Sequence, residues 1–239
     1  MTAGLPEMEL QDVAEQLLQP TRAVVGAELD QVQRAADEIA RRIARGGRLL
    51  TFGAGHSWSV AAEFCHRAGG LPDVKLMSLD DIVGPRSPQS DQLSDSEPER
   101  QPVNGSLIAE RYRIGEADAV VIASNSGRNG AIVELALRVR ERGAFLCGIV
   151  SLEHSAVCPS RHPSGRKLTD LCAVVLDNHG PVGDAAIDVG GTVRCGATSG
   201  ISGALLAQLL VVGIVRGLRA EGIEPPLLLS ANVDQPTQQ

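Results

Sequence analysis

The chain has 239 residues, 43% of them hydrophobic and 21% charged, proportions that are typical of a folded domain and argue against a disordered chain. Its formal net charge of −7 argues against a nucleic-acid-binding protein, because such proteins need a basic surface. Aromatic residues make up only 2% of the chain, so the core must be aliphatic, as in buried parallel strands and their covering helices. The five cysteines lack CxxC spacing, which favours free thiols and a cytoplasmic location.

The N-terminal part of the chain predicts helices. Residues 9–18 predict a short helix that ends at Pro20, since proline interrupts helical hydrogen bonding. Across residues 25–43, apolar side chains recur in steps of four and three and form one face of a second helix, which stops at the Gly46-Gly47 pair. We therefore expect a helical segment at 1–46 that forms a single structural unit with a domain at 47–239.

Short apolar runs alternate with helical patterns through the rest of the chain. We predict strands at 48–52, 74–79, 119–123, 145–150 and 173–176, and helices at 57–68, 107–113, 131–142 and 202–219. This alternation predicts an α/β fold with a five-stranded, parallel, doubly wound sheet of the flavodoxin-like kind. Residues 84–102 predict a long loop. The apolar stretch 201–215 is too short and too interrupted for a membrane span, which favours a buried core helix and no membrane association.

In such sheets, ligands bind outside the carboxyl ends of the strands, which singles out the loops that follow them. The first, Gly53-Ala54-Gly55-His56-Ser57, leaves a predicted strand and opens a helix. Glycines there let a ligand approach the backbone, and exposed N–H groups favour an anion. A dinucleotide-binding domain is an alternative, with Asp80 or Asp81 as the ribose-binding acid, although Trp58 stands where GxGxxG needs its third glycine.

The second loop, Ser124-Asn125-Ser126-Gly127-Arg128-Asn129, also follows an apolar strand and opens a helix. Hydroxyl groups, backbone amides and the Arg128 guanidinium at one helix start predict a phosphate cradle. Ordinary capping of the helix is the alternative, since serine and asparagine are common N-cap residues.

The core Ser124-x-Ser126-Gly127, preceded by Gly53-x-Gly55-x-Ser57, resembles the sugar isomerase (SIS) domain family of phosphosugar isomerases and phosphosugar-binding regulators. The stretches 52–57, 125–129, 160–165 and 230–234 resemble a branch of this family near the phosphoheptose isomerases. The resemblance implies that Ser124, Ser126 and Asn129 surround a phosphate, together with Asn125 and Gly127 of the same loop. It also implies that Ser57, Thr198 and Ser199 complete the pocket, although the last two residues would equally cap the final helix.

An aldose–ketose isomerase needs a base near the reacting carbon and a polar group at the oxygens. The candidate catalytic residues are Glu63, His56, Glu110 and His179. Asp184 follows in the polar segment after the last predicted strand, where we expect it to bind sugar hydroxyls or to form an Asx-type turn. No HxH or HExxH spacing occurs, so the sequence predicts no metal site.

The sequence therefore predicts a protein that binds a phosphosugar or amino-sugar phosphate and catalyses its aldose–ketose isomerisation without a cofactor. The alternatives are a non-catalytic phosphosugar sensor and a phosphosugar lyase that cleaves an ether. Apolar stripes on the N-terminal and final helices predict a homodimer or homotetramer, since the pockets of the resembled family are commonly completed between subunits.

Overall fold

A computed structural model describes residues 8–84, 97–190, 192–230 and 232 of the chain. Most of the predicted loop at 84–102 lies outside the described residues, as do Ala231, Val233 and Asp234 of the stretch 230–234.

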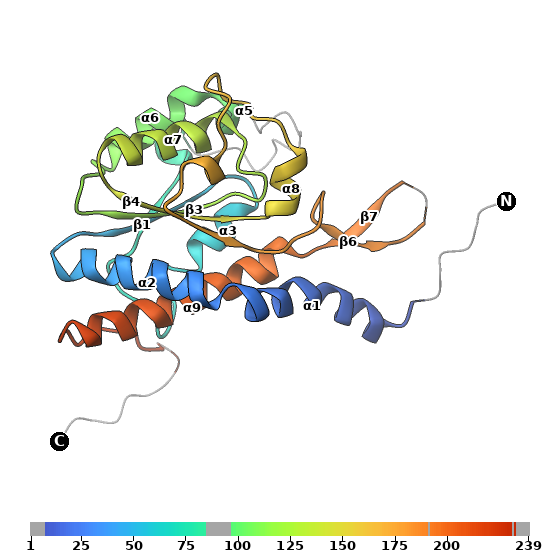
Figure 1. The fold of residues 1–239 in the computed structure, drawn as a ribbon, viewed down its shortest axis with the longest axis horizontal. Coiled ribbons are helices and arrows are strands. Elements are labelled where there is room, and N and C mark those ends of the chain that lie inside the picture. Colours follow the sequence, from blue (N-terminus) through green and yellow to red (C-terminus); the bar gives the residue numbers. More distant parts are fainter. Residues whose placement is uncertain (1–7, 85–96, 191, 231, 233–239) are drawn as a thin grey trace.

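A five-stranded parallel sheet forms the centre of the fold (Figure 1), and its strand order is β2-β1-β3-β4-β5. The strands are β1 (Leu49–Gly53), β2 (Lys75–Met77), β3 (Ala119–Ala123), β4 (Phe145–Val150) and β5 (Val174–Asp177). Every residue of β1, β3 and β4 is buried, as expected for apolar strands covered on both faces. The predicted α/β fold and its flavodoxin-like strand order are confirmed.

Helices cover both faces of the sheet (Figure 1). One core lies between the sheet and a layer of helices that includes α2 and α9, and the other lies between the sheet and α6 and α7. The first layer contains α1 (Leu10–Ala27), α2 (Leu29–Ala44), α3 (Ser57–Ala62) and α9 (Ser199–Ala220). The second contains α6 (Pro102–Arg111) and α7 (Gly130–Glu141). The short elements are α4 (Asp80–Val83), α5 (Glu97–Arg100), α8 (Leu152–Val157) and the 3-10 helix η2 (Leu168–Asp170).

Two expectations about the helices are wrong. The first helix does not end at Pro20 but runs through it to Ala27. Pro20 and Val24 are buried, and this burial offsets the backbone hydrogen bond that proline cannot make. The helix after the glycine loop ends at Ala62 rather than near residue 68, and the chain then turns so that Phe64 becomes buried in the core.

An antiparallel hairpin outside the sheet is not predicted by the sequence. It consists of β6 (Ala185–Asp188) and β7 (Arg194–Ala197), and it extends beyond the sheet beside α1 (Figure 1). Only Ile187 within these strands is fully buried, so the hairpin has no apolar alternation from which it could be recognised.

The final helix, α9, is long and apolar enough to cross a membrane by length and composition alone, with a mean hydropathy of 1.9 over 18 residues. However, 56% of that window is buried inside the fold. Its glycines permit close packing on α2, because a Cβ on Gly213 would lie 2.6 Å from Ala36 Cβ and one on Gly217 would lie 2.7 Å from Ala40 Cβ. These contacts are those of a core helix.

An ion pair joins the amino ends of β1 and β3. Arg48 precedes β1 and Asp118 precedes β3, and Arg48 Nη2 lies 2.7 Å from Asp118 Oδ2. The Asp118 carboxylate also accepts hydrogen bonds from the backbone N–H groups of Arg48 and Gly115. Burial raises the pKa of Asp118, but the hydrogen bonds from Arg48 and Gly115 outweigh burial and lower that pKa below its usual value. The pair therefore holds the two central strands in register.

Asp118→Asn should lower the free energy of unfolding at pH 7 by about 2–3 kcal/mol, because it leaves Arg48 without its anionic partner. A carboxyl group with a lowered pKa stabilises the fold above its unfolded pKa of about 3.9 and loses that effect as the pH falls through the folded value. The difference in the free energy of unfolding between wild type and variant, measured with urea, should thus be constant from pH 7 to 5 and shrink below about pH 4. A difference that grows with acidification would contradict this account.

Glu141→Gln is the matched control. Its ion pair with Arg138 is exposed, with 57% of the Glu141 side chain accessible, so its loss should change the free energy of unfolding by less than about 1 kcal/mol.

Candidate functional site

The candidate site lies where β1 and β3 end side by side. The two strands pair in register up to Gly53 and Ala123, so the glycine loop (residues 53–57) and the serine loop (residues 124–129) leave the sheet at the same level. Because β2 and β3 lie on opposite sides of β1, this is the point where the strand order changes direction. Open α/β sheets form their ligand-binding crevice at such a point.

The glycine loop turns sharply into α3. A Cβ on Gly53 would lie 2.2 Å from the carbonyl oxygen of Ser57, and Gly55 has a φ of +57°, so both positions require glycine. Trp58, 47% exposed, borders a cavity of about 350 Å³ that is lined by Gly53, Ala54, Gly55, Ser78, Leu79 and Asp80. His56 is exposed at the start of α3, with its carbonyl accepting a hydrogen bond from Ser59 Oγ.

The serine loop is held by its own backbone and by η2. Ser124 is 8% exposed, and its Oγ accepts a hydrogen bond of 3.2 Å from Gly127 N. Gly127 O accepts from Leu168 N at 2.8 Å. Ser126 differs from Ser124, because its half-buried hydroxyl makes no hydrogen bond with any residue in the described part of the chain. Its hydroxyl is therefore available to a ligand at the mouth of the loop.

Asn129 links the serine loop to a carboxylate that sequence analysis missed. Its Nδ2 donates to Glu99 Oε1 at 2.8 Å, and Glu99 Oε2 lies 3.7 Å from where a Cβ on Gly55 would stand. Glu99, in α5, thus lies between the serine loop and the glycine loop. Asn129 Oδ1 accepts from Arg161 Nη1 at 2.9 Å, so its side chain is engaged at both ends and does not cap α7.

Gly180 lies between the start of α9 and the serine loop. A Cβ on Gly180 would be 3.6 Å from both Asn125 Oδ1 and Thr198 Oγ1, and Asn125 Oδ1 accepts a hydrogen bond from Asn178 Nδ2. The Asp184 carboxylate accepts from Ser199 N and Ser199 Oγ, both at 2.7 Å, and from Thr198 N at 3.1 Å. The structure thus brings Asp184, Thr198 and Ser199 together, with the carboxylate occupied in holding the first turn of α9.

Three of the predicted catalytic residues are not brought together with the two loops. The Glu63 carboxylate pairs with Arg67 at 3.0 Å and accepts from Gln208 of α9. Glu110 is exposed at the end of α6, next to the amino ends of the strands, where Arg48 bonds to the Tyr112 carbonyl. His179 Nε2 lies 3.1 Å from Glu28 Oε1 and lines a separate cavity of about 630 Å³ between α1 and the hairpin.

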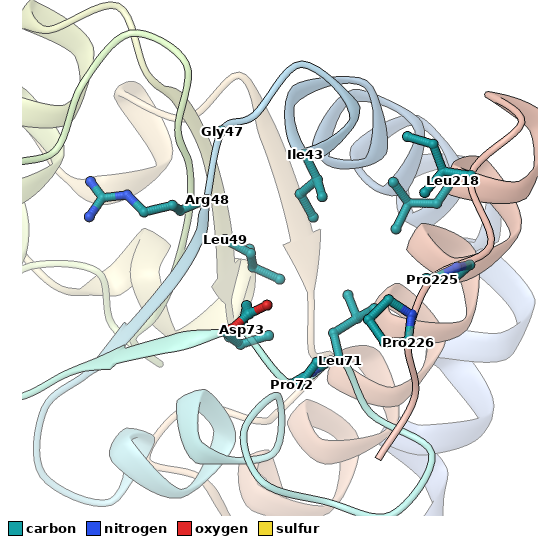
Figure 2. Close-up of a pocket in the computed structure, with 12 residues that line it drawn as sticks. Ile43, Gly47, Arg48, Leu49, Leu71, Pro72, Asp73, Leu218, Pro225 and Pro226 are labelled. Atoms are coloured by element: carbon teal, nitrogen blue, oxygen red, sulfur yellow. The ribbon is translucent and has the colours of Figure 1, made fainter.

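A third cavity, of about 170 Å³, lies near the amino ends of β1 and β2. Figure 2 shows side chains from α2, from the turn before β2 and from the end of α9 around it, among them Ile43, Leu71 and Leu218. Its lining is mainly apolar and offers no cradle for a phosphate. Within the described ranges, no group of three His, Cys, Asp or Glu side chains is placed to hold a metal ion.

A family model described as the SIS domain matches residues 14–151. A UPF0309 protein of Halalkalibacterium halodurans is 36% identical over 202 residues, which cover 84% of this chain and 82% of the relative. A UPF0309 protein of Streptomyces coelicolor is also 36% identical, over 236 residues that cover 98% of this chain and 92% of the relative.

Solved structures show a similar fold at low sequence identity. A phosphoheptose isomerase from Francisella tularensis has a TM-score of 0.57 at 14% identity, covering 87% of this chain and 96% of its own. The Vibrio vulnificus NanR protein complexed with ManNAc-6P has a TM-score of 0.53 at 15% identity, covering 90% and 68%. The family model spans more than half of the chain, and the UPF0309 relatives align with most of it. The chain therefore belongs to the SIS domain family.

Proposed function

We propose that this protein binds a phosphosugar or amino-sugar phosphate in the crevice between the glycine loop and the serine loop, and catalyses its aldose–ketose isomerisation. The observation that carries the proposal is the position of Glu99, whose carboxylate contacts Asn129 of the serine loop and approaches Gly55 of the glycine loop. This position supports the proposal, because the carboxylate would lie beside a phosphate held by the serine loop.

The phosphate is held by neutral donors in this proposal. The serine loop leads directly into α7, which begins at Gly130, and the unpaired N–H groups of a helix start attract an anion. The Ser126 hydroxyl adds a donor. The Ser124 hydroxyl accepts from Gly127 N, so its part is to hold the loop in shape while the ligand meets Ser126 and the backbone.

Glu99 is the proposed base. In an aldose–ketose isomerisation, the carboxylate would remove the proton from the carbon next to the carbonyl, giving an enediolate, and return that proton to the former carbonyl carbon. A second proton would pass from the hydroxyl oxygen to the former carbonyl oxygen, so that the step balances. The substrate is neither oxidised nor reduced overall, so no cofactor is required. His56 is exposed on the glycine loop, where it can contact sugar oxygens. Glu63 pairs with Arg67 and His179 with Glu28, and Glu110 is exposed at the end of α6. None of the three lies between the two loops as Glu99 does, which favours Glu99 as the base.

The structural relatives support both the proposed activity and its alternative. A phosphoheptose isomerase shares the fold, and so does a protein complexed with ManNAc-6P. A sensor and an isomerase would share the phosphate cradle, and a sensor would differ in lacking proton transfer. A lyase is less well supported, because it would need an acid at the leaving group in addition to the base.

We also propose that the protein is cytoplasmic and forms a homodimer or homotetramer. Apolar side chains are exposed on α1 and α9, including Val25 at 52% and Val212 at 57%, and association would bury them. Light scattering at micromolar concentration should give two or four times the chain mass of 25.1 kDa, and a mass of one chain would contradict this proposal.

Ser126→Ala should weaken phosphosugar binding about tenfold, the loss of one hydrogen bond to a charged group, without changing stability. Ser124→Ala is the matched comparison. It should lower the free energy of unfolding by about 1–2 kcal/mol, because Gly127 N–H loses its buried acceptor. Calorimetric titration with a sugar phosphate and urea unfolding separate the two effects. Unchanged phosphosugar affinity in Ser126→Ala would contradict the proposal that the serine loop holds the phosphate.

Glu99→Gln should leave phosphosugar affinity within a few-fold of wild type but slow proton transfer by about 100-fold or more, as expected for the loss of a catalytic base. The assay is exchange of the sugar proton next to the carbonyl in heavy water, followed by nuclear magnetic resonance. Glu110→Gln, exposed at the far end of α6, is the control and should exchange at the wild-type rate. A wild-type protein that binds the sugar without any exchange would be a sensor.

A further inference from the structure

Three arginine residues collect around Asn129 at the start of α7. Arg161 donates from Nη1 to Asn129 Oδ1 at 2.9 Å, and its backbone N–H donates to the Arg128 carbonyl, also at 2.9 Å. The Arg100 carbonyl oxygen lies 2.2 Å from where a Cβ on Gly130 would stand. These contacts bring the backbones of Arg100 and Arg128 and the side chain of Arg161 together beside the serine loop.

This arginine cluster (Arg100, Arg128 and Arg161) has an excess of positive charge. Burial lowers the pKa of Arg161, the charges of Arg128 and Arg100 lower it further, and Glu99 opposes this effect. Four arginines elsewhere show the opposite direction, because carboxylate partners raise the pKa values of Arg41, Arg48, Arg138 and Arg219. The whole chain has a net charge of −7, yet positive charges are held together here. Such like charges destabilise one another unless an anion binds between them.

The arginine cluster lies next to the phosphate cradle but uses different groups. The cradle consists of backbone amides and the Ser126 hydroxyl, whereas the cluster offers planar guanidinium groups, which bind carboxylates and phosphates in a bidentate manner. Asn129 connects the two regions, since its side chain contacts Glu99 on one side and Arg161 on the other. A sugar whose phosphate occupies the cradle would therefore present a second substituent to the arginines.

We infer that the arginine cluster binds a second acidic group of the ligand, so that the preferred ligand is a phosphosugar that also carries a carboxylate or a second phosphate. This inference rests on the proposed function, because it takes the first phosphate to occupy the serine loop. It narrows the substrate class from phosphosugars in general to doubly acidic ones.

Calorimetric titration with three probes tests the inference: glucose 6-phosphate, gluconate 6-phosphate and fructose 1,6-bisphosphate. Wild type should bind at least one of the two doubly acidic probes about tenfold or more tightly than glucose 6-phosphate. Preference for gluconate 6-phosphate would identify a carboxylate as the second group, and preference for the bisphosphate would identify a phosphate. Arg100→Gln and Arg161→Gln should abolish the preference while changing glucose 6-phosphate affinity by less than about threefold.

Arg140→Gln is the matched control, because it removes the same charge from an exposed position near the other end of α7. It should retain the preference, and thermal melts should show that all variants are folded. Equal affinity of wild type for the three probes would overturn the inference and leave phosphosugar binding intact. Equal weakening of all three probes by Arg100→Gln and Arg161→Gln would also overturn it, because the cluster would then hold the single phosphate. Failure of wild type to bind any probe would overturn the inference and the proposed function together.

Discussion

The parallel pairing of β1 with β3, from Leu49 opposite Ala119 to Gly53 opposite Ala123, determines where the glycine loop and the serine loop lie. Because the two strands end at the same level, the loops that follow them emerge side by side, and the helices that those loops open begin at one crevice. The Arg48–Asp118 pair fixes the same two strands at their other end. A shift of one residue in this register would separate the glycine loop from the serine loop and turn their side chains to the opposite faces of the sheet.

Around this crevice, some polar side chains bond to the backbone and others bond to one another. The side-chain oxygens of Ser124 and Asp184 accept hydrogen bonds from backbone N–H groups of the serine loop and of α9. Glu99, Asn129 and Arg161 instead form a chain of charged and polar groups along the mouth of the crevice. In the proposed function such a chain would make the site selective, because a ligand would have to match neutral donors, a carboxylate and guanidinium groups at once.

The sequence correctly predicts the elements in which the local pattern of apolar residues matches the burial in the structure. The apolar runs at 119–123 and 145–150 became β3 and β4 with those bounds, because strands buried on both faces need apolar residues throughout. It failed where distant contacts override local preference, as at Pro20, which burial keeps inside α1. No local pattern reveals Glu99, whose partner Asn129 is 30 residues away. Glu63 and His179 are close to loops in sequence, but their side chains contact α9 and Glu28 instead.

The central claim, that the crevice at the ends of β1 and β3 holds a phosphosugar, is most directly tested by the thermal stability of the wild-type protein with matched pairs of sugars and sugar phosphates. A ligand that binds the native state at 100 times its Kd stabilises it by about 2.7 kcal/mol. The account predicts a rise in Tm with at least one sugar phosphate and none with the same sugar lacking its phosphate. Stabilisation by nucleotides alone, or equally by the phosphorylated and unphosphorylated sugars, would contradict it.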